Sequence, residues 1–374
     1  MTAADGLVVG RTKLVDHGPD AVRWTTVILS EGYRADELPK FHADADAFVA
    51  KLFGTRPFTD MWCAINVYRV DVSSTDSGAD DPAICGDGSA GSGNTAATFF
   101  DTTYCTNATR RLLAGDQALA LTTAQAQVPE VDATVVIVNS AQYGGAGGSV
   151  AFFSTHPDAA EIGVHELGHS AFGLIDEYGD IINSWAGGEP PEPNVTRVTD
   201  RATTKWANLI AAATLLPTQA NPDCTTENTT ASSVAAGTVG LFEGGGRAHC
   251  GLYRAEHGCR MRTLGQPFCV VCGNAIRRRL APHLPAFSGP TVGAQFTGTL
   301  AANESRRWFT YDWPACWHVV WTVQATTPVT PGPGIRWRVQ VERASRERIT
   351  YWIRVANLTA GPVDIEARYA IVAK

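Results

Sequence analysis

The chain has 374 residues, of which 44% are hydrophobic and 18% charged, so it can form two or three domains with buried cores. Its formal net charge of −7 argues against a nucleic-acid binder, which usually carries a concentrated basic surface. No apolar run approaches the roughly 20 residues that span a bilayer, so we expect no membrane partner.

Strands and helices alternate in the N-terminal half of the sequence. Apolar runs rich in β-branched residues predict strands, and apolar side chains at helical spacing predict helices. Strands are expected at residues 24–30, 63–72 and 133–140, and helices at 36–54, 110–127 and, further along the chain, at 203–215 and 274–280. A long polar loop at residues 74–94 interrupts the alternation. The order of these elements predicts an α/β sheet.

A glycine-rich bend at residues 143–145 leads into a further predicted strand at residues 147–154, GGSVAFFS. An edge strand beside an active site can pair with an extended peptide, because its outer backbone groups are free. We expect this strand to be such an edge. A simple hairpin strand is an equal alternative.

The strongest motif is HELGH at residues 165–169. Residues four apart on an α-helix lie on the same face, so His165 and His169 can direct their imidazoles at one metal ion. Glu166 follows the first histidine, where its carboxylate can take a proton from metal-bound water. The helix is predicted to end at Gly173, in a left-handed turn. The pattern is typical of zinc hydrolases.

Catalytic zinc sites usually take three protein ligands and leave the fourth position to water. The candidates for the third ligand are Asp176 and Glu177, because a glycine turn would bring the chain back beneath the helix. The longer string HELGHSAFGLIDEY resembles the signature of the IgA peptidase family of zinc metallopeptidases. The resemblance extends to SEGYRADEL, VYRVDVSSTDSGAD and YGGAGG in the N-terminal half. It implies Asp176 as the third ligand, with Glu177 as the alternative.

The resemblance also implies a fold and an activity. The expected fold is a zincin-like, metzincin-like α/β catalytic domain with an active-site helix. The expected activity is that of a zinc-dependent endopeptidase acting on a protein or peptide substrate, with Glu166 as general base. The family name does not identify the substrate of this chain. Two alternatives are a zinc amidase acting on cell-wall peptides and a non-catalytic binding protein on a peptidase scaffold.

Two further residues have possible roles at the site. Met261, in the string CRMRT, is similar to the methionine of the metzincin Met-turn, which supports the histidine ligands from below; a gap-filling core methionine is the alternative. Tyr253 is a candidate phenol donor to the oxyanion that develops during hydrolysis. Tyr178 and His249 compete for that role.

The nine cysteines favour an oxidising compartment and therefore a secreted or extracellular protein. The first residues lack the apolar core of a signal peptide, so either the chain is cytoplasmic or it begins after a removed signal. Cys85 and Cys105 flank a polar loop and are expected to staple it. Cys269 and Cys272 have the spacing of half a zinc knuckle, but no second pair is present beyond them. A disulfide framework is therefore expected among the five cysteines of residues 224–272.

The composition changes near residue 286, which predicts a boundary between a catalytic domain at 1–285 and an accessory domain at 286–374. The second segment alternates apolar and polar positions between Pro, Gly and Asn turns, as in a β-sandwich. Its strands are expected at 294–300, 305–313, 316–325, 336–345, 349–359 and 363–373. Most of its tryptophans are expected in the core. The oligomeric state stays open.

Overall fold

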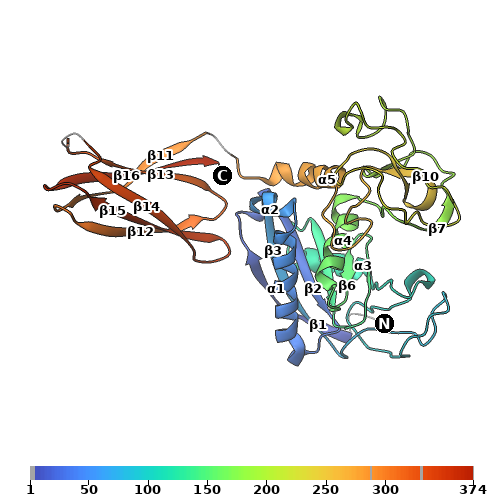
Figure 1. Ribbon diagram of the computed structural model, residues 1–374. Helices are drawn as coiled ribbons and strands as arrows, with labels where there is room; N and C mark the ends of the chain where they lie inside the picture. The colour runs from blue at the N-terminus through green and yellow to red at the C-terminus, as the bar shows by residue number, and fades with distance from the viewer. Residues whose placement is uncertain (1–4, 287–288, 329–331, 374) are drawn as a thin grey trace. The chain divides into compact units, whose positions relative to one another are not determined.

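The computed structural model describes residues 5–286, 289–328 and 332–373 (Figure 1). The chain divides into two compact units, Met1–Leu14 with Gly18–His283, and Val15–His17 with Leu284–Lys374. Across the described ranges, no helix has both the length and the apolar character that crossing a bilayer requires. The HELGH motif lies in the first unit.

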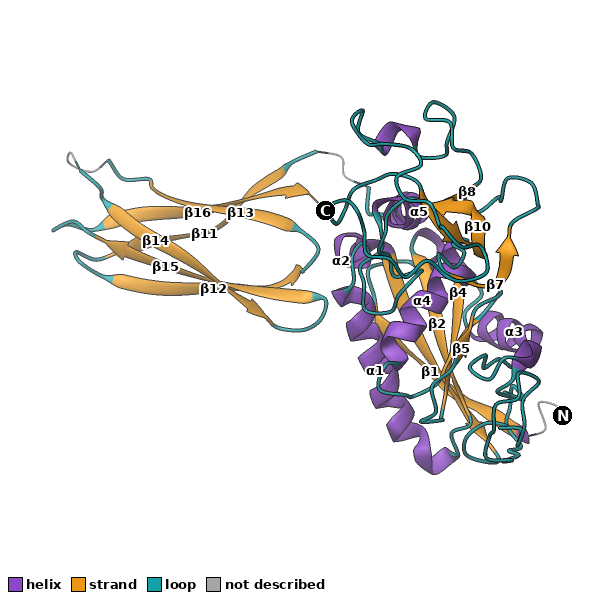
Figure 2. Ribbon diagram, turned by 45° about the vertical axis from the view of Figure 1, so that its right-hand side comes forward, coloured by secondary structure: helices purple, strands orange, loops and turns teal. Residues whose placement is uncertain are grey.

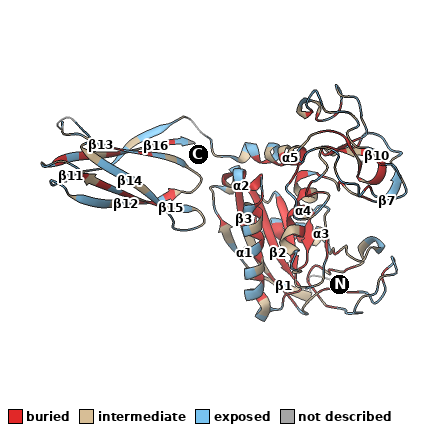
Figure 3. Ribbon diagram, in the orientation of Figure 1, coloured by how far each residue is buried: buried red, intermediate tan, exposed pale blue. Residues whose placement is uncertain are grey.

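A six-stranded sheet forms the centre of the first unit (Figure 1). In spatial order its strands are β1 (Gly6–Val15), β3 (Ile65–Ser74), β2 (Trp24–Glu31), β4 (Ala133–Val138), β6 (Ala151–Phe153) and β5 (Gly145–Ala146). β2 is parallel to β3 and β4, and β4 is parallel to β6. Every residue of β2 is buried (Figure 3), and so is every residue of β4, whose sequence ATVVIV is nearly all apolar. The strands predicted at 24–30, 63–72 and 133–140 are confirmed.

The strand expected at the edge of this sheet lies inside it. β6 pairs with β4 on one side and with β5 on the other. The glycine-rich bend brings the chain back, so the two residues of β5 pair antiparallel to β6 and form the edge. The edge role predicted for residues 147–154 is therefore wrong, and the hairpin alternative is confirmed.

Helices cover both faces of the sheet (Figure 2). The α-helices in the described part of this unit are α1 (Leu38–Gly54), α2 (Phe58–Met61), α3 (Gln117–Gln127), α4 (Ala159–Phe172) and α5 (Val270–Leu280). α3 packs on one face, where its buried alanines join the side chains of β2 and β4. α1 and α4 lie on the other face. Phe48 of α1 contacts Phe153 of β6, with ring centroids 5.1 Å apart, and Phe172 of α4 contacts Trp24 at 5.3 Å.

Short 3₁₀ helices complete the first unit at Asp20–Val22, Ala35–Glu37, Trp62–Ala64, Thr106–Ala108, Ala207–Leu209 and Ala281–His283. Three predicted helices have different extents in the structure. The helix expected at 110–127 begins only at Gln117, because the Asp116 carboxylate accepts a hydrogen bond from Leu119 N at 2.9 Å and caps it. The helix expected at 203–215 is a single 3₁₀ turn. α5 begins four residues before the predicted 274, at Val270.

A second, smaller sheet lies in the part of the chain where periodicity predicted no strands. It contains β7 (Gly179–Ser184), β8 (Val195–Thr196), β9 (Phe242–Gly245) and β10 (Arg247–Arg254). β10 is central, because it pairs with each of the other three. A disulfide between Cys224 and Cys250 ties the loop before β9 to β10.

The second unit consists of two three-stranded antiparallel sheets. Their strands are β11 (Thr291–Leu300), β12 (Ser305–Pro314), β13 (His318–Ala325), β14 (Ile335–Arg343), β15 (Arg348–Asn357) and β16 (Val363–Ala373). The orders are β11-β16-β13 and β12-β15-β14. Buried side chains from both sheets, such as Ile365 and Ile353, form one cluster. Trp313 and Trp321 belong to this core, whereas Trp337 is 36% exposed, so the tryptophan prediction is only partly confirmed.

Candidate metal centre

The HELGH motif lies on α4, and the C-terminal end of this helix sets the direction of the chain beyond it. Gly173 ends the helix in the left-handed conformation, with φ of 62° and ψ of 31°. Its N–H donates to His169 O at 3.2 Å, and Leu174 N donates to Gly168 O at 3.1 Å. These hydrogen bonds reverse the chain, as the sequence predicts, so the residues after Gly173 return towards the histidine face of α4.

Three side-chain atoms converge beneath this helix. His165 Nε2 and His169 Nε2 lie 3.1 Å apart, because the two residues are one helical turn from each other. Asp176 Oδ1 lies 3.2 Å from His165 Nε2 and 3.1 Å from His169 Nε2. The Asp176 carboxylate therefore faces both histidines at once.

The other nitrogen of each ring determines which tautomer is present. His165 Nδ1 lies 3.0 Å from Arg260 O, and His169 Nδ1 lies 2.7 Å from Leu174 O. A carbonyl oxygen can only accept, so each Nδ1 carries the proton and donates it. Each Nε2 of the neutral rings then presents a lone pair to the centre, which is the arrangement that metal-ligating histidines adopt.

This set of donors fits a zinc ion. Two imidazole nitrogens and a carboxylate oxygen are typical ligands of catalytic zinc, and tetrahedral bonds of about 2.0–2.1 Å place neighbouring donors about 3.3 Å apart. The three observed separations are 3.1–3.2 Å. Three lone-pair donors at such distances repel one another unless a cation or a proton lies among them.

The pKa values of Asp176 and His169 also show that positive charge is favoured between these side chains. Burial tends to raise the pKa of Asp176, but the hydrogen bonds and charges of the two histidines outweigh it and hold that pKa below its usual range. Burial tends to lower the pKa of His169, but Asp176 and Glu166 raise it to about 9. In the absence of a metal, a proton is thus held where a cation would bind.

Glu166 lies beside the histidines, inside the same cavity. The ligand atoms of His165, Glu166 and His169 are all within 4.8 Å of one another. Burial raises the pKa of Glu166, although the nearby histidines act in the opposite direction. The glycines of the β5–β6 bend permit this close packing, since a Cβ at Gly147 would lie 2.7 Å from His169 Cβ and 3.0 Å from Glu166 Oε2. A carboxylate with a raised pKa in a cavity is suited to proton transfer.

A cavity of about 990 Å³ opens onto the three converging atoms. Its lining includes Ala146 and Gly147 at the sheet edge, together with Arg111 and Tyr178. This volume is in the usual range for a ligand-binding pocket. The chain therefore presents Glu166 and the histidines to a space that can hold part of a peptide.

The structure separates the candidate tyrosines. Tyr178 lines the cavity, its phenol hydrogen-bonds with Asp176, and Arg111 Nη2 donates to its oxygen at 3.4 Å. Tyr253 lies on β10 beside Glu243 and is not among the described residues that line the cavity. The third candidate, His249, is buried and also lies outside the lining.

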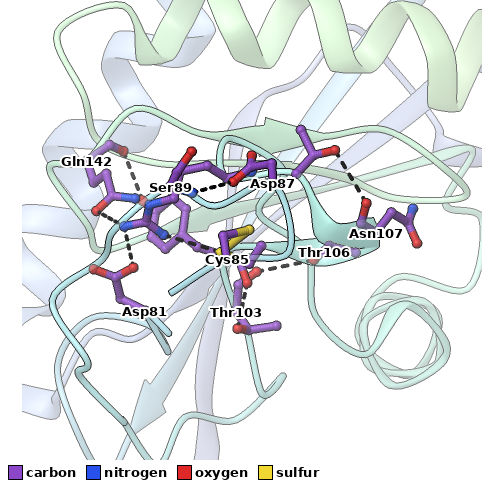
Figure 4. Close-up of a disulfide and its surroundings, with 12 residues drawn as sticks. Asp81, Cys85, Asp87, Ser89, Thr103, Thr106, Asn107 and Gln142 are labelled. Atoms are coloured by element: carbon purple, nitrogen blue, oxygen red, sulfur yellow. Dashed lines mark hydrogen bonds and ion pairs between the residues drawn. A yellow bond between two sulfur atoms is a disulfide. The ribbon is translucent and has the colours of Figure 1, made fainter. Parts of the chain in front are cut away.

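A disulfide-linked loop, drawn in Figure 4, contributes residues to the lining of the cavity. Cys85 and Cys105 are bonded, which confirms the predicted staple. Immediately after Cys105, Thr106 and Asn107 reach the cavity lining. Cys105 and Asn107 have φ of 65° and 50°, left-handed values that non-glycine residues rarely adopt. The disulfide therefore anchors a strained turn at the cavity wall.

Met261 packs against α4 at Gly168. It is fully buried, and a Cβ at Gly168 would lie 2.9 Å from its Sδ. Gly168 lies between the two histidines, so the sulfur packs directly under the ligand-bearing turn. The neighbouring residue, Arg260, provides the carbonyl that orients His165. Sequence alone had no signal for this carbonyl or for that of Leu174, because backbone groups carry no residue identity.

Glu177 has a different environment from Asp176. It is fully buried, and its carboxylate lies with the thiols of Cys259, Cys269 and Cys272, all ligand atoms within 4.8 Å of one another. These three thiols form no disulfide. The disulfide framework expected at residues 224–272 is therefore wrong for them and holds only for Cys224 and Cys250.

Comparison with protein families adds an independent finding. The model of the family described as IgA Peptidase M64 matches residues 12–233, which is more than half of the chain and includes α4 and the Gly173 turn. No curated protein matches the chain significantly.

Proposed function

The chain belongs to the IgA Peptidase M64 family, and on this premise we propose that it is a zinc-dependent endopeptidase whose metal ligands are His165, His169 and Asp176. Membership supports hydrolysis of peptide bonds in a protein or peptide substrate. The observation that carries the zinc assignment is the convergence of His165 Nε2, His169 Nε2 and Asp176 Oδ1 at separations of 3.1–3.2 Å.

A bound zinc ion would polarise the scissile carbonyl and lower the pKa of water at the site. Glu166 is the proposed general base. Its carboxylate shares the cavity with both histidines, and burial raises its pKa, so it can accept a proton from the attacking water and pass it to the leaving amine nitrogen. The carbonyls of Arg260 and Leu174 keep the two rings in the required tautomer.

Tyr178 is the proposed donor to the developing oxyanion, in place of Tyr253. Its phenol lies at the cavity wall, hydrogen-bonded with Asp176, and Arg111 adds a positive charge next to it. The location of Tyr253 on β10 does not favour such a role. A hydrogen-bond donor directed at the charge that forms in the transition state accelerates acyl transfer.

The fold supports the same function. We propose that the first unit is a zincin-like catalytic domain of the metzincin type, with α4 as the active-site helix and Met261 as its supporting methionine. An extended substrate would lie along Ala146 and Gly147, next to β5.

We further propose that the second unit is an accessory β-sandwich, with the domain boundary near residue 286. The disulfides Cys85–Cys105 and Cys224–Cys250 favour a secreted protein.

The decisive experiment replaces the proposed base and leaves the metal ligands intact. We expect Glu166→Gln to retain zinc and to lose activity on casein by about 10²–10⁴-fold. Glu130→Gln is the matched control, because Glu130 is exposed and lies outside the cavity lining. Glu166→Gln activity within a few-fold of wild type would refute the assignment.

The wild-type protein also tests the two alternative functions. Cleavage of peptidoglycan fragments without cleavage of casein would favour an amidase. A zinc-loaded wild type that is inactive on both substrates would favour a binding protein.

A further inference from the structure

A second group of potential metal ligands lies in the first unit, apart from the histidine centre. It comprises Cys259, Cys269, Cys272 and Glu177, whose ligand atoms are all within 4.8 Å of one another. Their exposed fractions are 0%, 3%, 0% and 0%. The four residues come from three places in the chain: the turn after α4, the Met261 turn and the start of α5. Folding therefore brings them together.

The separations within this cluster match a tetrahedral zinc site. Zn–S bonds of about 2.3 Å place two sulfurs about 3.8 Å apart, and a sulfur and a carboxylate oxygen about 3.6 Å apart. Cys259 Sγ and Cys272 Sγ are 3.7 Å apart. Glu177 Oε1 lies 3.1 Å from Cys272 Sγ and 3.8 Å from Cys269 Sγ. A disulfide would instead bring two of the sulfurs to about 2.05 Å.

Backbone N–H groups point at the sulfurs. Cys269 N donates to Cys259 Sγ at 3.3 Å, and Cys272 N donates to Cys269 Sγ at 3.4 Å. The second of these bonds caps α5, an 11-residue helix, so Cys269 also lies at the positive end of the helix dipole. N–H donors of this kind interact favourably with a thiolate, the form of cysteine that binds metals.

The Glu177 carboxylate is a buried charged group that a cation would satisfy. Asn194 Nδ2 donates to its Oε1 at 3.0 Å, but its Oε2 is buried and has no hydrogen-bond partner among the described residues. The buried cation whose charge acts on Glu177, Arg254, donates its Nη1 to the carbonyls of Glu243 and Gly244. A carboxylate oxygen buried without a partner is costly, and a coordinated cation removes that cost.

We propose that Cys259, Cys269, Cys272 and Glu177 bind a second zinc ion. Four protein ligands close the coordination sphere, so this ion would be structural and have no position for water. The proposal does not depend on the proposed function, because it concerns a separate group of residues and makes no use of catalysis.

Such an ion would link the segments that build the histidine centre. Glu177 is adjacent to Asp176, and its N–H donates to Met261 O at 2.7 Å. Cys259 is adjacent to Arg260, whose carbonyl orients His165. Coordination of one ion by the four side chains would thus hold Asp176 and the Arg260 carbonyl, which both contact His165, in fixed positions relative to each other.

The test counts metal ions in the full-length chain without measuring activity. After expression with zinc and gel filtration, we expect about two zinc ions per wild-type chain and about one in the double variant His165→Ala/His169→Ala. Replacing the remaining zinc in that variant with cobalt should give the strong near-ultraviolet absorption of sulfur-to-cobalt charge transfer. Adding Cys269→Ser should abolish this absorption, whereas the control Cys63→Ser, at a buried cysteine outside the cluster, should leave it unchanged.

Three results would overturn the proposal: a double variant without metal, a cobalt form without the sulfur band, or a non-reduced peptide map with a disulfide between any of the three cysteines. If the histidine variant fails to fold, cobalt-substituted wild type is measured instead, and it must show the same band. Failure of the proposed function gives a different pattern, in which the sulfur band is present and Glu166→Gln keeps full activity.

Discussion

Asp176 and Glu177 are neighbours in the chain, yet their carboxylates enter two different clusters. Asp176 Oδ1 faces His165 Nε2 at 3.2 Å, whereas Glu177 Oε1 accepts a hydrogen bond from Cys272 Sγ at 3.1 Å. Successive side chains of an extended segment point in opposite directions, so one stretch of backbone can serve both clusters. Two backbone hydrogen bonds of 2.7 Å hold this stretch in place, one from Gly246 N to Asp176 O and one from Glu177 N to Met261 O.

The first prediction uses this divergence. Asp176→Ala should greatly weaken metal binding at the histidines, because it removes a direct ligand. Glu177→Ala should weaken cobalt binding at the three cysteines, so that the sulfur-to-cobalt band needs a higher cobalt concentration, and should weaken the histidine site by only about 10–100-fold, as the loss of an outer supporting residue does. Metal titration of both variants, followed by the cobalt spectrum, measures the two effects. If Asp176→Ala binds at the histidines like wild type and Glu177→Ala does not, the ligand assignment is wrong by one residue.

The second prediction concerns the phenol donor. Tyr178→Phe should lower kcat by about 10²–10³-fold with little change in KM, because the lost hydrogen bond forms mainly in the transition state. Tyr253→Phe is the matched control and should leave both constants close to wild type, since its ring lies outside the cavity lining. Steady-state kinetics on a fluorogenic peptide measures this. A large loss with Tyr253→Phe and none with Tyr178→Phe would reverse the assignment.

The third prediction concerns the turn after α4. Gly173 has φ of 62°, and no atom would lie within 4 Å of an added Cβ, so Gly173→Ala introduces backbone strain without a clash. We expect a loss of about 1–2 kcal/mol in the free energy of unfolding. Gly54→Ala is the control, because Gly54 also has open space around it, lies in helix α1 and has no left-handed φ. It should be neutral or slightly stabilising. Chemical denaturation of both variants should differ in this direction, and equal stabilities would contradict it.

The fourth prediction concerns the disulfide at the cavity wall. Cys85→Ser/Cys105→Ser opens a crosslink that spans 20 residues, which should cost about 3 kcal/mol of stability. It should also raise KM, because Thr106 and Asn107 lose their anchor at the cavity. Cys224→Ser/Cys250→Ser is the control: the loop is of similar size, with a separation of 26 residues, but the residues adjacent to its two cysteines do not line the cavity, as Thr106 does next to Cys105. It should lower stability with a smaller effect on KM. Equal changes in KM for the two pairs would show that the wall does not depend on its crosslink.

The sequence by itself determined the elements whose signals are local. The spacing of His165 and His169 predicts one helical face, and Gly173 predicts the end of the helix, because both depend only on residues a few positions apart. The six C-terminal strands are predicted by alternation between turn residues in the same way. The strands β2 and β4 were predictable because their apolar runs reflect burial on both faces. Their order in the sheet was not.

Only the tertiary structure decided which groups meet across long distances in the chain. Residues 147–154 were expected at the edge of the sheet. In the structure β5 occupies the edge instead, because the glycine-rich bend folds β5 back against β6. The sequence does not show which of Tyr178 and Tyr253 lies near the histidines. Only the structure shows that Tyr178 lines the cavity and Tyr253 does not. The three cysteines looked like disulfide partners, because spacing does not reveal that Glu177, 92 positions before Cys269, lies among them. Local periodicity reports the faces of single elements, whereas a binding site is formed by the packing of several elements against one another.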